Sequence, residues 1–441
     1  MSADEANAIR DKVRDLQVRL YRAAKASPER RFHALYDKVY REDVLSKAWQ
    51  TVKANAGAAG VDQRTIRQIE QSGVEGFLAE LASDLRTDRY RAQWVRRVRI
   101  PKADGKQRPL GIPTVRDRVA QAAAKVVLEP IFEADFRDCS YGFRPKRSAH
   151  QACERLRQAV NAGANWIVEL DIEAFYDRID HELLMKLVEK RVSDVRMLKL
   201  LRKWLKAGVL DEGKVLASDQ GVPQGGVISC VLANVVLHEL DRSWEDHSSH
   251  VGQLIRYADD AIVACRTQAQ AREALYRIRA ILKRLKLTLH PDKTRLVSVG
   301  NGRQGFDFLG FECRMVAAKE YRGKRYFQCW PSRRAMQRVR ERIKVITAPR
   351  HRLPEPIEPI VAEVNRVVRG WGVYFRVGNS TRKFRAIDRS VRERLVILLV
   401  NKARRGERAR KRYSWALLEK LGVYRLQGTV RWAAATPTAV R

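Results

Sequence analysis

Apolar residues recur every three or four positions through most of the first hundred residues, and this spacing predicts amphipathic helices. The pattern is clearest over Asp11–Ala24 and Phe32–Ala54. A glycine-rich stretch, Asn55–Asp62, interrupts it and predicts a loop. The chain contains no internal repeat. Its N-terminal part is therefore expected to be a set of packed helices.

The middle of the chain changes to short runs of strand-forming residues. Trp166–Ile172 has the composition of a buried strand, and a helical pattern follows it with Asp180 as its N-cap. Leu254–Ala264 consists of two short apolar runs around Asp259 and Asp260, which predicts a hairpin with two carboxylates at its turn.

The last quarter returns to a helical pattern with a basic outer face. Apolar residues share one side of a predicted helix, namely Ile387, Val391, Leu395, Leu398 and Leu399. Arg385, Arg389 and Arg392 lie on the opposite side. Leu353–Pro359 is rich in proline and is expected to link two helical segments.

The net charge of the chain indicates what kind of partner it binds. The 441 residues hold 87 Lys and Arg against 51 Asp and Glu, a formal net charge of +36. Disorder does not explain this excess, because 45% of the residues are hydrophobic and nine are Trp. A folded chain with such a charge favours polyanions, and nucleic acid is a commoner partner than an anionic membrane.

More than half of the excess charge lies at the C-terminal end. Residues 330–441 carry a net +20 in 112 residues. Within them, Lys402–Arg412 has seven positive charges in eleven positions and no apolar periodicity, and it contains Arg404, Arg405, Arg408 and Arg410. Two interpretations stay open for this segment, a solvated tail and a set of phosphate contacts, and we favour the second.

The N-terminus lacks the apolar core of a signal peptide, and no apolar run has the length of a membrane span. We therefore expect a cytosolic protein. The six cysteines are scattered without a Cys-x-x-Cys pair, so we expect small core residues rather than zinc ligands or disulfides.

Three aspartates stand at predicted strand ends. Asp171 alone is better explained by a turn or a helix cap than by a metal site. A Tyr-x-Asp-Asp sequence also arises by chance at roughly the few-percent level in a chain of this length. Together, however, Asp171, Asp259 and Asp260 are unexpected in so basic a chain. Two magnesium ions would explain them, because such ions bind carboxylates and can clamp both oxygens of an in-line phosphoryl transfer, as a polymerase requires.

The ordered motifs resemble those of a bacterial group II intron-encoded reverse transcriptase and maturase. The resemblance spans roughly residues 30 to 420 and rests on the order of many motifs. These are Val61-Asp62 at the end of the glycine-rich loop, Ile100–Pro113, Ser140–Pro145, the Asp-Ile-x-x-Phe-Tyr-Asp sequence from Asp171, Gly221–Ser229, Tyr257–Asp260, Leu287–Thr294, Phe306–Phe311 and Gly370–Phe375.

The resemblance implies roles for individual residues. Asp171, Asp259 and Asp260 would be catalytic and would hold two Mg²⁺ ions, with the carbonyl of Ile172 as a further ligand. The incoming deoxynucleotide would contact Lys102, Arg108, Tyr176, Gln224 and Lys293, with Tyr176 as a steric gate against the ribose 2′-hydroxyl. Each of two residues also has a non-functional explanation. Tyr176 could be an ordinary core residue, and Lys293 could be an exposed lysine at a strand end. RNA would contact Arg385, Arg389 and Arg392 together with Arg404, Arg405, Arg408 and Arg410.

The implied fold is an α+β right-hand polymerase. Residues 1–95 would form a helical N-terminal extension and the start of the fingers, and residues 96–320 the fingers and palm around a small antiparallel sheet. Residues 321–441 would form a basic helical thumb and maturase domain. No endonuclease domain is expected, because the C-terminal region lacks paired cysteines and a His-Asn-His module. The chain departs from the family pattern at Gln63, Cys230 and Val373, and the last of these bears on splicing contacts.

The implied function is RNA-directed DNA synthesis combined with binding, folding and splicing of an intron RNA and retrohoming into a DNA target. The partners would be intron RNA, an RNA template with its primer, and deoxynucleotides, in a cytoplasmic ribonucleoprotein. Two alternatives stay open. One is a reverse transcriptase with a host role in DNA repair or phage defence and no intron, and the other is an RNA-binding splicing factor without polymerase activity. Retron and diversity-generating enzymes fit the motifs less well.

Overall fold

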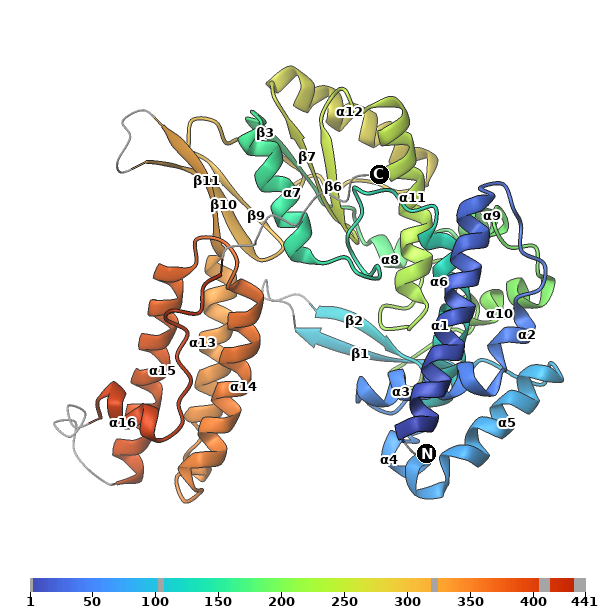
Figure 1. Cartoon of the computed structure of the whole chain (residues 1–441), viewed down its shortest axis with the longest axis horizontal. Helices are drawn as coiled ribbons and strands as arrows, with labels where there is room; N and C mark the ends of the chain where they lie inside the picture. Colours follow the sequence, from blue (N-terminus) through green and yellow to red (C-terminus); the bar gives the residue numbers. More distant parts are fainter. Residues whose placement is uncertain (1–2, 102–106, 319–323, 404–412, 432–441) are drawn as a thin grey trace. The chain divides into compact units, whose positions relative to one another are not determined.

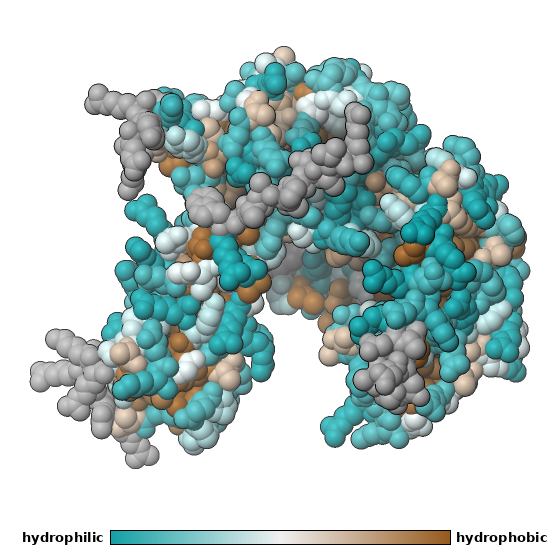
Figure 2. Space-filling model, viewed as in Figure 1, coloured by the Kyte–Doolittle hydropathy of each residue, from teal (hydrophilic) through white to brown (hydrophobic). Residues whose placement is uncertain are grey.

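The computed structural model describes residues 3–101, 107–318, 324–403 and 413–431. The chain divides into two compact units, which are described separately here. The first contains Met1–Ser148, Glu169–Val263 and Arg272–Arg295, and the second contains Ala149–Val168, Ala264–Ala271 and Leu296–Arg441. Among the described residues, no helix has the length and apolar character needed to cross a membrane. In the view of Figure 2 the surface of each unit is mainly hydrophilic, with small separate apolar areas.

The N-terminal part of the first unit is helical. Its elements are α1 (Ala3–Ala26), α2 (Tyr36–Val39), α3 (Glu42–Ala54), α4 (Ile66–Ser72) and α5 (Val74–Arg86). Both α1 and α3 pack along α6 (Val115–Glu133), as Figure 1 shows. Most side chains of α6 are buried, so it forms the centre of this block.

The predicted helix over Phe32–Ala54 is wrong in its first part. Residues 32–35 are not helical, and the chain breaks again between α2 and α3. The cause is a contact distant in sequence, because the carboxylate of Asp194 accepts hydrogen bonds from the backbone N–H groups of Leu35 and Tyr36 at 2.7 and 2.8 Å. Phe32 also forms a parallel bridge with Val192. These contacts keep the segment out of a helix, while the glycine-rich loop at 55–62 follows α3 as predicted.

A small mixed sheet of order β2-β1-β4-β5 follows. It consists of β1 (Val95–Pro101), β2 (Gln107–Ile112), β4 (Val209–Asp211) and β5 (Lys214–Leu216). The β1–β2 pair is antiparallel, with Ile100 opposite Arg108. This register places Arg108 in the exposed first part of β2.

A second sheet has the order β6-β7-β3-β8. Its strands are β3 (Trp166–Leu170), β6 (Gln253–Tyr257), β7 (Asp260–Cys265) and β8 (Arg295–Ser298), and three of them have residues in both units. The predicted strand before Asp171 and the predicted hairpin are confirmed. The predicted cap is confirmed as well, because the Asp180 side chain accepts a hydrogen bond from the Leu183 N–H at the start of α9.

Helices alternate with these strands in the sequence. They are α7 (Ala149–Asn161), α8 (Phe175–Arg178), α9 (His181–Glu189), α10 (Val195–Leu205), α11 (Ser229–His247) and α12 (Gln268–Arg284). Buried apolar side chains line most of α11, but three polar residues, Ser229, Asn234 and Asp241, are buried there too.

The second unit combines an antiparallel sheet with helices. The sheet has the order β11-β10-β9 and consists of β9 (Gly305–Phe308), β10 (Phe311–Ala317) and β11 (Arg325–Pro331). The helices are α13 (Arg333–Thr347), α14 (Ile357–Phe375), α15 (Thr381–Lys402) and α16 (Trp415–Lys420), with the short 3₁₀ turn η1 (Arg350–Arg352). In Figure 1, α13, α14 and α15 lie side by side, and α13 packs against both others.

The proline-rich segment links α13 to α14 as predicted, although Ile357 already begins the second helix. On α15, the predicted apolar face is buried at Ile387, Val391, Leu395 and Leu398, and Leu399 is half-buried. The six cysteines are all free, with three buried and three half-buried.

Candidate active site

Asp171 stands directly after β3, on backbone that is held in place. Its carbonyl accepts a hydrogen bond from the His290 N–H at 2.8 Å, and Ile172 forms an antiparallel bridge with Leu289. Glu173 N–H in turn donates to the Thr288 carbonyl at 2.9 Å. The segment 288–290 therefore fixes the chain on which the first carboxylate is carried.

Asp259 and Asp260 lie at the turn between β6 and β7. Ala258 and Asp259 form the two-residue turn, with Ala258 in the left-handed region at φ +56°, and Asp260 begins β7. At the opposite end of the sheet, Asn165 N–H donates to the Cys265 carbonyl, so the start of β3 meets the end of β7. Neighbouring strands in this arrangement also bring the end of β3 to the start of β7, which puts Asp171 beside the two other aspartates.

The three carboxylates influence one another electrostatically. Burial, followed by the charges of Asp259 and Asp171, raises the pKa of Asp260 to about 6, and the Arg108 cation opposes this rise. Burial also raises the pKa of Asp259, with a smaller contribution from Asp171, against the effects of its own backbone N–H and of Arg108. Asp171 and Asp259 are half-buried and Asp260 is exposed. A group of like charges at one sheet edge is an environment that a bound cation would stabilise.

Two cations face this group from other elements. Lys293 Nζ lies 3.5 Å from a carboxylate oxygen of Asp171, with 54% of the lysine side chain exposed. Arg108, on the exposed part of β2, lowers the pKa values of both Asp259 and Asp260. The structure thus brings these two predicted residues to the aspartates, while Lys102 lies outside the described residues.

Tyr176 and Gln224 border the same region. Burial raises the pKa of the Tyr176 hydroxyl, with further contributions from Cys230 and Asp259, and Arg108 lowers it. The Gln224 carbonyl accepts a hydrogen bond from the Gly111 N–H at 2.7 Å. Gly225, at φ +114°, approaches the same strand so closely that an added Cβ would lie 2.6 Å from the Gly111 carbonyl oxygen. The 223–226 turn therefore lies against β2, which carries Arg108.

The donor set suits hard divalent cations, although it is incomplete by itself. Within the described ranges, no group of three or more His, Cys, Asp or Glu side chains stands ready to hold an ion. Magnesium is commonly held by one or two carboxylates together with substrate phosphates and water, rather than by a protein cage. Carboxylate oxygens that repel one another at an accessible strand end fit that mode of binding.

The predicted RNA contacts differ in their surroundings. Arg385 and Arg389 are exposed on α15. Arg392 is half-buried and donates through Nη2 to the Tyr413 carbonyl at 3.3 Å. Arg404, Arg405, Arg408 and Arg410 fall outside the part of the chain that the structure describes.

Sequence reasoning missed two sets of residues. The first is an exposed basic face on α13, formed by Arg333, Arg334, Arg338, Arg340, Arg342 and Lys344. Its signal was present, since these cations surround an apolar stripe at helical spacing. The second is a buried polar cluster behind the 258–259 turn, centred on Arg256. Its only signal in the sequence is an arginine inside an apolar strand.

Comparison with known proteins shows which protein family the chain resembles. The profile described as reverse transcriptase (RNA-dependent DNA polymerase) matches residues 100–313, and that of the group II intron maturase-specific domain matches residues 336–415. RNA-directed DNA synthesis is the activity that the first description gives to its family.

Individual relatives agree with the profiles. The chain is 36% identical to Protein YkfC of Escherichia coli over 336 residues, which cover 68% of this chain and 87% of that protein. It is 39% identical to the group II intron-encoded protein LtrA of Lactococcus lactis over 216 residues, which cover 48% of this chain and 35% of LtrA. The nuclear intron maturase 1 of Arabidopsis thaliana is 29% identical over 185 residues, covering 30% of this chain and 26% of that maturase. With both profiles in this order and the aspartates at one sheet edge, the chain belongs to the group II intron reverse transcriptase and maturase family.

Proposed function

We propose that this chain is an RNA-directed DNA polymerase that extends a primer on an RNA template at the edge of the β6-β7-β3-β8 sheet. The observation that carries the proposal is the meeting of Asp171, Asp259 and Asp260 at strand ends, where the charges of Asp259 and Asp171 help to raise the pKa of Asp260. The membership of the family supports it, because polymerases of this family use divalent metal ions.

In this proposal, Asp171, Asp259 and Asp260 hold two Mg²⁺ ions, with the Ile172 carbonyl as a further ligand. When bound, the ions would activate the primer 3′-hydroxyl and neutralise charge on the departing pyrophosphate. The chain itself contributes rigid positioning. The backbone of residues 171–173 is hydrogen-bonded to residues 288–290, so the backbone that carries the Asp171 side chain is fixed before substrate arrives.

The incoming deoxynucleotide is proposed to lie between the aspartates and β2. Arg108 offers a planar fork for triphosphate oxygens, and Lys102 and Lys293 offer point charges. The Tyr176 ring would close the space beside the ribose C2′ and exclude a hydroxyl there. Gln224, on the turn that lies against Gly111, would contact the base-pairing nucleotide or the primer.

The helical second unit supports a role in RNA binding. Residues 336–415 match the maturase-specific domain, and α13 and α15 present exposed arginines. We propose a right-hand arrangement with residues 1–95, 96–320 and 321–441 as extension, polymerase and maturase regions. The chain would bind its intron RNA, assist splicing and support retrohoming as a cytoplasmic ribonucleoprotein.

The direct experiment is primer extension by the unmutated protein on an RNA template with a DNA primer. Incorporation that requires Mg²⁺ and stops with a chelator is the expected result. Binding of the RNA without any incorporation would contradict the polymerase proposal and favour a splicing factor. Sequencing of the RNA that co-purifies with the protein tests the second part, since a structured intron RNA is expected and its absence would favour a host role.

A further inference from the structure

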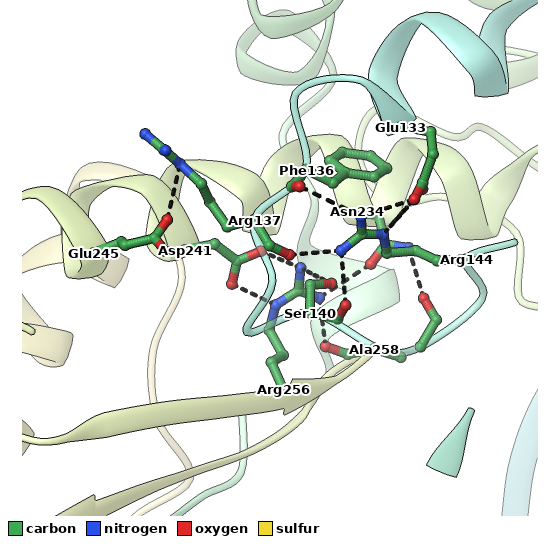
Figure 3. Close-up of polar contacts among 11 residues, drawn as sticks. Glu133, Phe136, Arg137, Ser140, Arg144, Asn234, Asp241, Glu245, Arg256 and Ala258 are labelled. Carbon is green, nitrogen blue, oxygen red and sulfur yellow. Dashed lines mark hydrogen bonds and ion pairs between the residues drawn. The ribbon is translucent and has the colours of Figure 1, made fainter. Parts of the chain in front are cut away.

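Arg256 has no exposed surface and is the last residue but one of β6, three residues before Asp259. Its charge is paired with Asp241 of α11, which is also wholly buried, and Nε donates to one carboxylate oxygen at 2.7 Å. Nη2 donates to the other carboxylate oxygen. The pair therefore connects the hairpin that carries Asp259 and Asp260 to the helix behind it, as Figure 3 shows.

Every N–H group of the Arg256 guanidinium has an acceptor. Besides the two bonds to Asp241, Nη1 donates to the Asn234 side-chain oxygen at 3.0 Å and to the Ala258 carbonyl at 2.9 Å. Nη2 donates to the Ser140 hydroxyl oxygen at 2.8 Å. A guanidinium has five such donors in a fixed fork, and a lysine has three on a flexible stem, so only arginine can make this set.

The bond to Ala258 reaches the catalytic turn itself. The Ala258 carbonyl and the Asp259 N–H belong to one planar peptide unit, so holding that oxygen fixes the direction in which Asp259 leaves the turn. Ala258 has φ +56°, a backbone conformation that a residue with a side chain adopts only when its surroundings impose it.

The segment 139–142 holds the same turn from a second side. Arg256 N–H donates to the Cys139 carbonyl, and the Arg256 carbonyl accepts from the Tyr141 N–H, both at 2.8 Å. Gly142 then approaches so closely that an added Cβ would lie 2.2 Å from the Ala258 nitrogen. The Asn234 side chain donates to the Gly142 carbonyl at 2.9 Å, so one residue of α11 contacts both the arginine and this segment.

A further arginine holds this segment in turn. Arg144 is paired with Glu133 and donates to the carbonyls of Arg137 and Ser140 at 2.6 and 2.7 Å. The Arg144 and Glu133 side chains are drawn above and to the right of Arg256 in Figure 3. The motif Ser140–Pro145 thus contributes residues that support the turn.

Stability alone is a weak reason for such an arrangement. A buried ion pair contributes little net stability compared with well-packed apolar residues, because removing two charges from water is costly. Apolar side chains could fill the space between β6 and α11, but they could not bind the Ala258 carbonyl. What the arginine adds is a fixed backbone next to the catalytic carboxylates.

We propose that Arg256 is a positioning residue, which fixes the Ala258–Asp259 peptide so that Asp259 and Asp260 hold the metal ions in productive geometry. The inference rests on the proposed polymerase function. Arg256 does not contact substrate in this account, and it acts through the turn that it supports.

The test compares the unmutated protein with the double variant Arg256→Met/Asp241→Leu, which removes both charges and leaves neither buried alone. Loss of outer partners of metal ligands generally costs 10–100-fold in metal affinity or activity. We expect a rate of single-nucleotide incorporation at saturating nucleotide that is lower by roughly 100-fold, and a Mg²⁺ concentration for half-maximal rate that is higher by about 10-fold. The Kd for primer–template should change by less than about 2-fold, since the phosphate contacts remain.

A second readout does not depend on activity. Binding of Mn²⁺ to the protein, followed by the paramagnetic resonance signal of free Mn²⁺, should weaken by about 10-fold in the double variant. Mn²⁺ binding that is lost in Asp259→Asn is counted as binding at this site. Arg191→Met is the matched control, because Arg191 is also buried and paired with Asp135, and its other bonds go to carbonyls of residues 24, 27 and 28. This control should lose stability and keep its metal dependence.

Two outcomes would overturn the inference. One is a folded double variant with unchanged Mg²⁺ and Mn²⁺ dependence, and the other is an equal shift in Arg191→Met. If the double variant does not fold, the same measurements on Arg256→Lys give the answer. This variant keeps the positive charge and loses the five-donor guanidinium. An unmutated protein that neither incorporates nucleotides nor binds Mn²⁺ at this site would instead refute the proposed function, so the two failures are distinguishable.

Discussion

Gly142 shows at the scale of one residue how closely the backbone segments behind the active site approach one another. Its missing side chain lets residues 139–142 lie against the peptide of Ala258, where a Cβ would meet backbone atoms at 2.2 and 2.8 Å. Backbone atoms cannot yield as a flexible side chain can, so any side chain at 142 must displace the turn that carries Asp259 and Asp260.

We therefore predict that Gly142→Ala lowers the free energy of unfolding by about 1–3 kcal/mol, the usual cost of overpacking, and reduces nucleotide incorporation more than this loss explains. Urea unfolding and single-nucleotide incorporation measure the two effects. Gly76→Ala in α5 is the control, because nothing lies within 4 Å of an added Cβ there, and it should gain about 0.5–1 kcal/mol. Normal activity in a folded Gly142→Ala protein would show that the close approach does not matter.

Tyr176 is expected to set the choice between sugars. Replacing it by Ala opens space beside the ribose and should raise the use of ribonucleotides relative to deoxynucleotides by roughly 10–200-fold in kcat/KM, the range for small steric differences in a pocket. Tyr176→Phe keeps the ring and should keep the selectivity. An unchanged ratio in Tyr176→Ala would assign the residue to core packing.

Helix α11 contains features that were predictable from the sequence and features that were not. Its apolar face was predictable, but the buried Asn234 and Asp241 are recognisable as polar contacts only once Arg256 is opposite them. The hairpin with Asp259 and Asp260 was predictable for a local reason, since apolar runs on both sides of a turn define it. The non-helical start of the segment 32–54 was not predictable, because its cause is Asp194, far away in the sequence. Local patterns therefore sufficed for the carboxylates and failed for the residues that support them.

The same helix carries a histidine that should make stability depend on pH. Burial lowers the pKa of His238 to about 4, although Asp241 and Glu239 oppose this and Arg256 and Arg137 add to it. The unfolded chain then takes up a proton near pH 6.5 and the folded one does not, so stability decreases as the pH falls from about 6.5 to about 4.

We predict that His238→Gln removes roughly 3 kcal/mol of this pH-dependent loss, as the two pKa values imply. The measurement is urea unfolding of both proteins at several values between pH 7 and pH 4. Carboxylates titrate in both proteins and cancel in the difference. Parallel curves for the two proteins would mean that His238 is not held neutral.

At the scale of the whole molecule, charge and chemistry are distributed unevenly. The net +20 of residues 330–441 belongs largely to the unit with the helices α13–α15, whereas the three aspartates belong to the other unit. The exposed arginines of α13 add to the RNA contacts that the sequence analysis predicted on α15 and in the segment 404–410. The affinity for partners that bind through phosphates should therefore decrease as the salt concentration rises.

Neutralising Arg385 and Arg389 together, as Arg385→Gln/Arg389→Gln, should weaken RNA binding. The slope of log affinity against log salt should fall in magnitude by about 1.4–1.8, or 0.7–0.9 for each lost phosphate contact. Filter binding over a series of salt concentrations measures this slope. The same loss of charge on α12, through Arg272→Gln/Arg279→Gln, is the control and should change the slope less. Equal slopes for the two double variants would show that α15 has no special part in RNA binding.

We propose that three aspartates at one sheet edge form a metal-dependent site for RNA-templated DNA synthesis. Mg²⁺-dependent incorporation and RNA affinity can be measured side by side for the unmutated protein, Asp259→Asn and the exposed control Asp292→Asn. We expect Asp259→Asn to abolish incorporation and to keep RNA affinity nearly unchanged, and Asp292→Asn to retain both. Incorporation by Asp259→Asn at the rate of the unmutated protein would refute the proposed site.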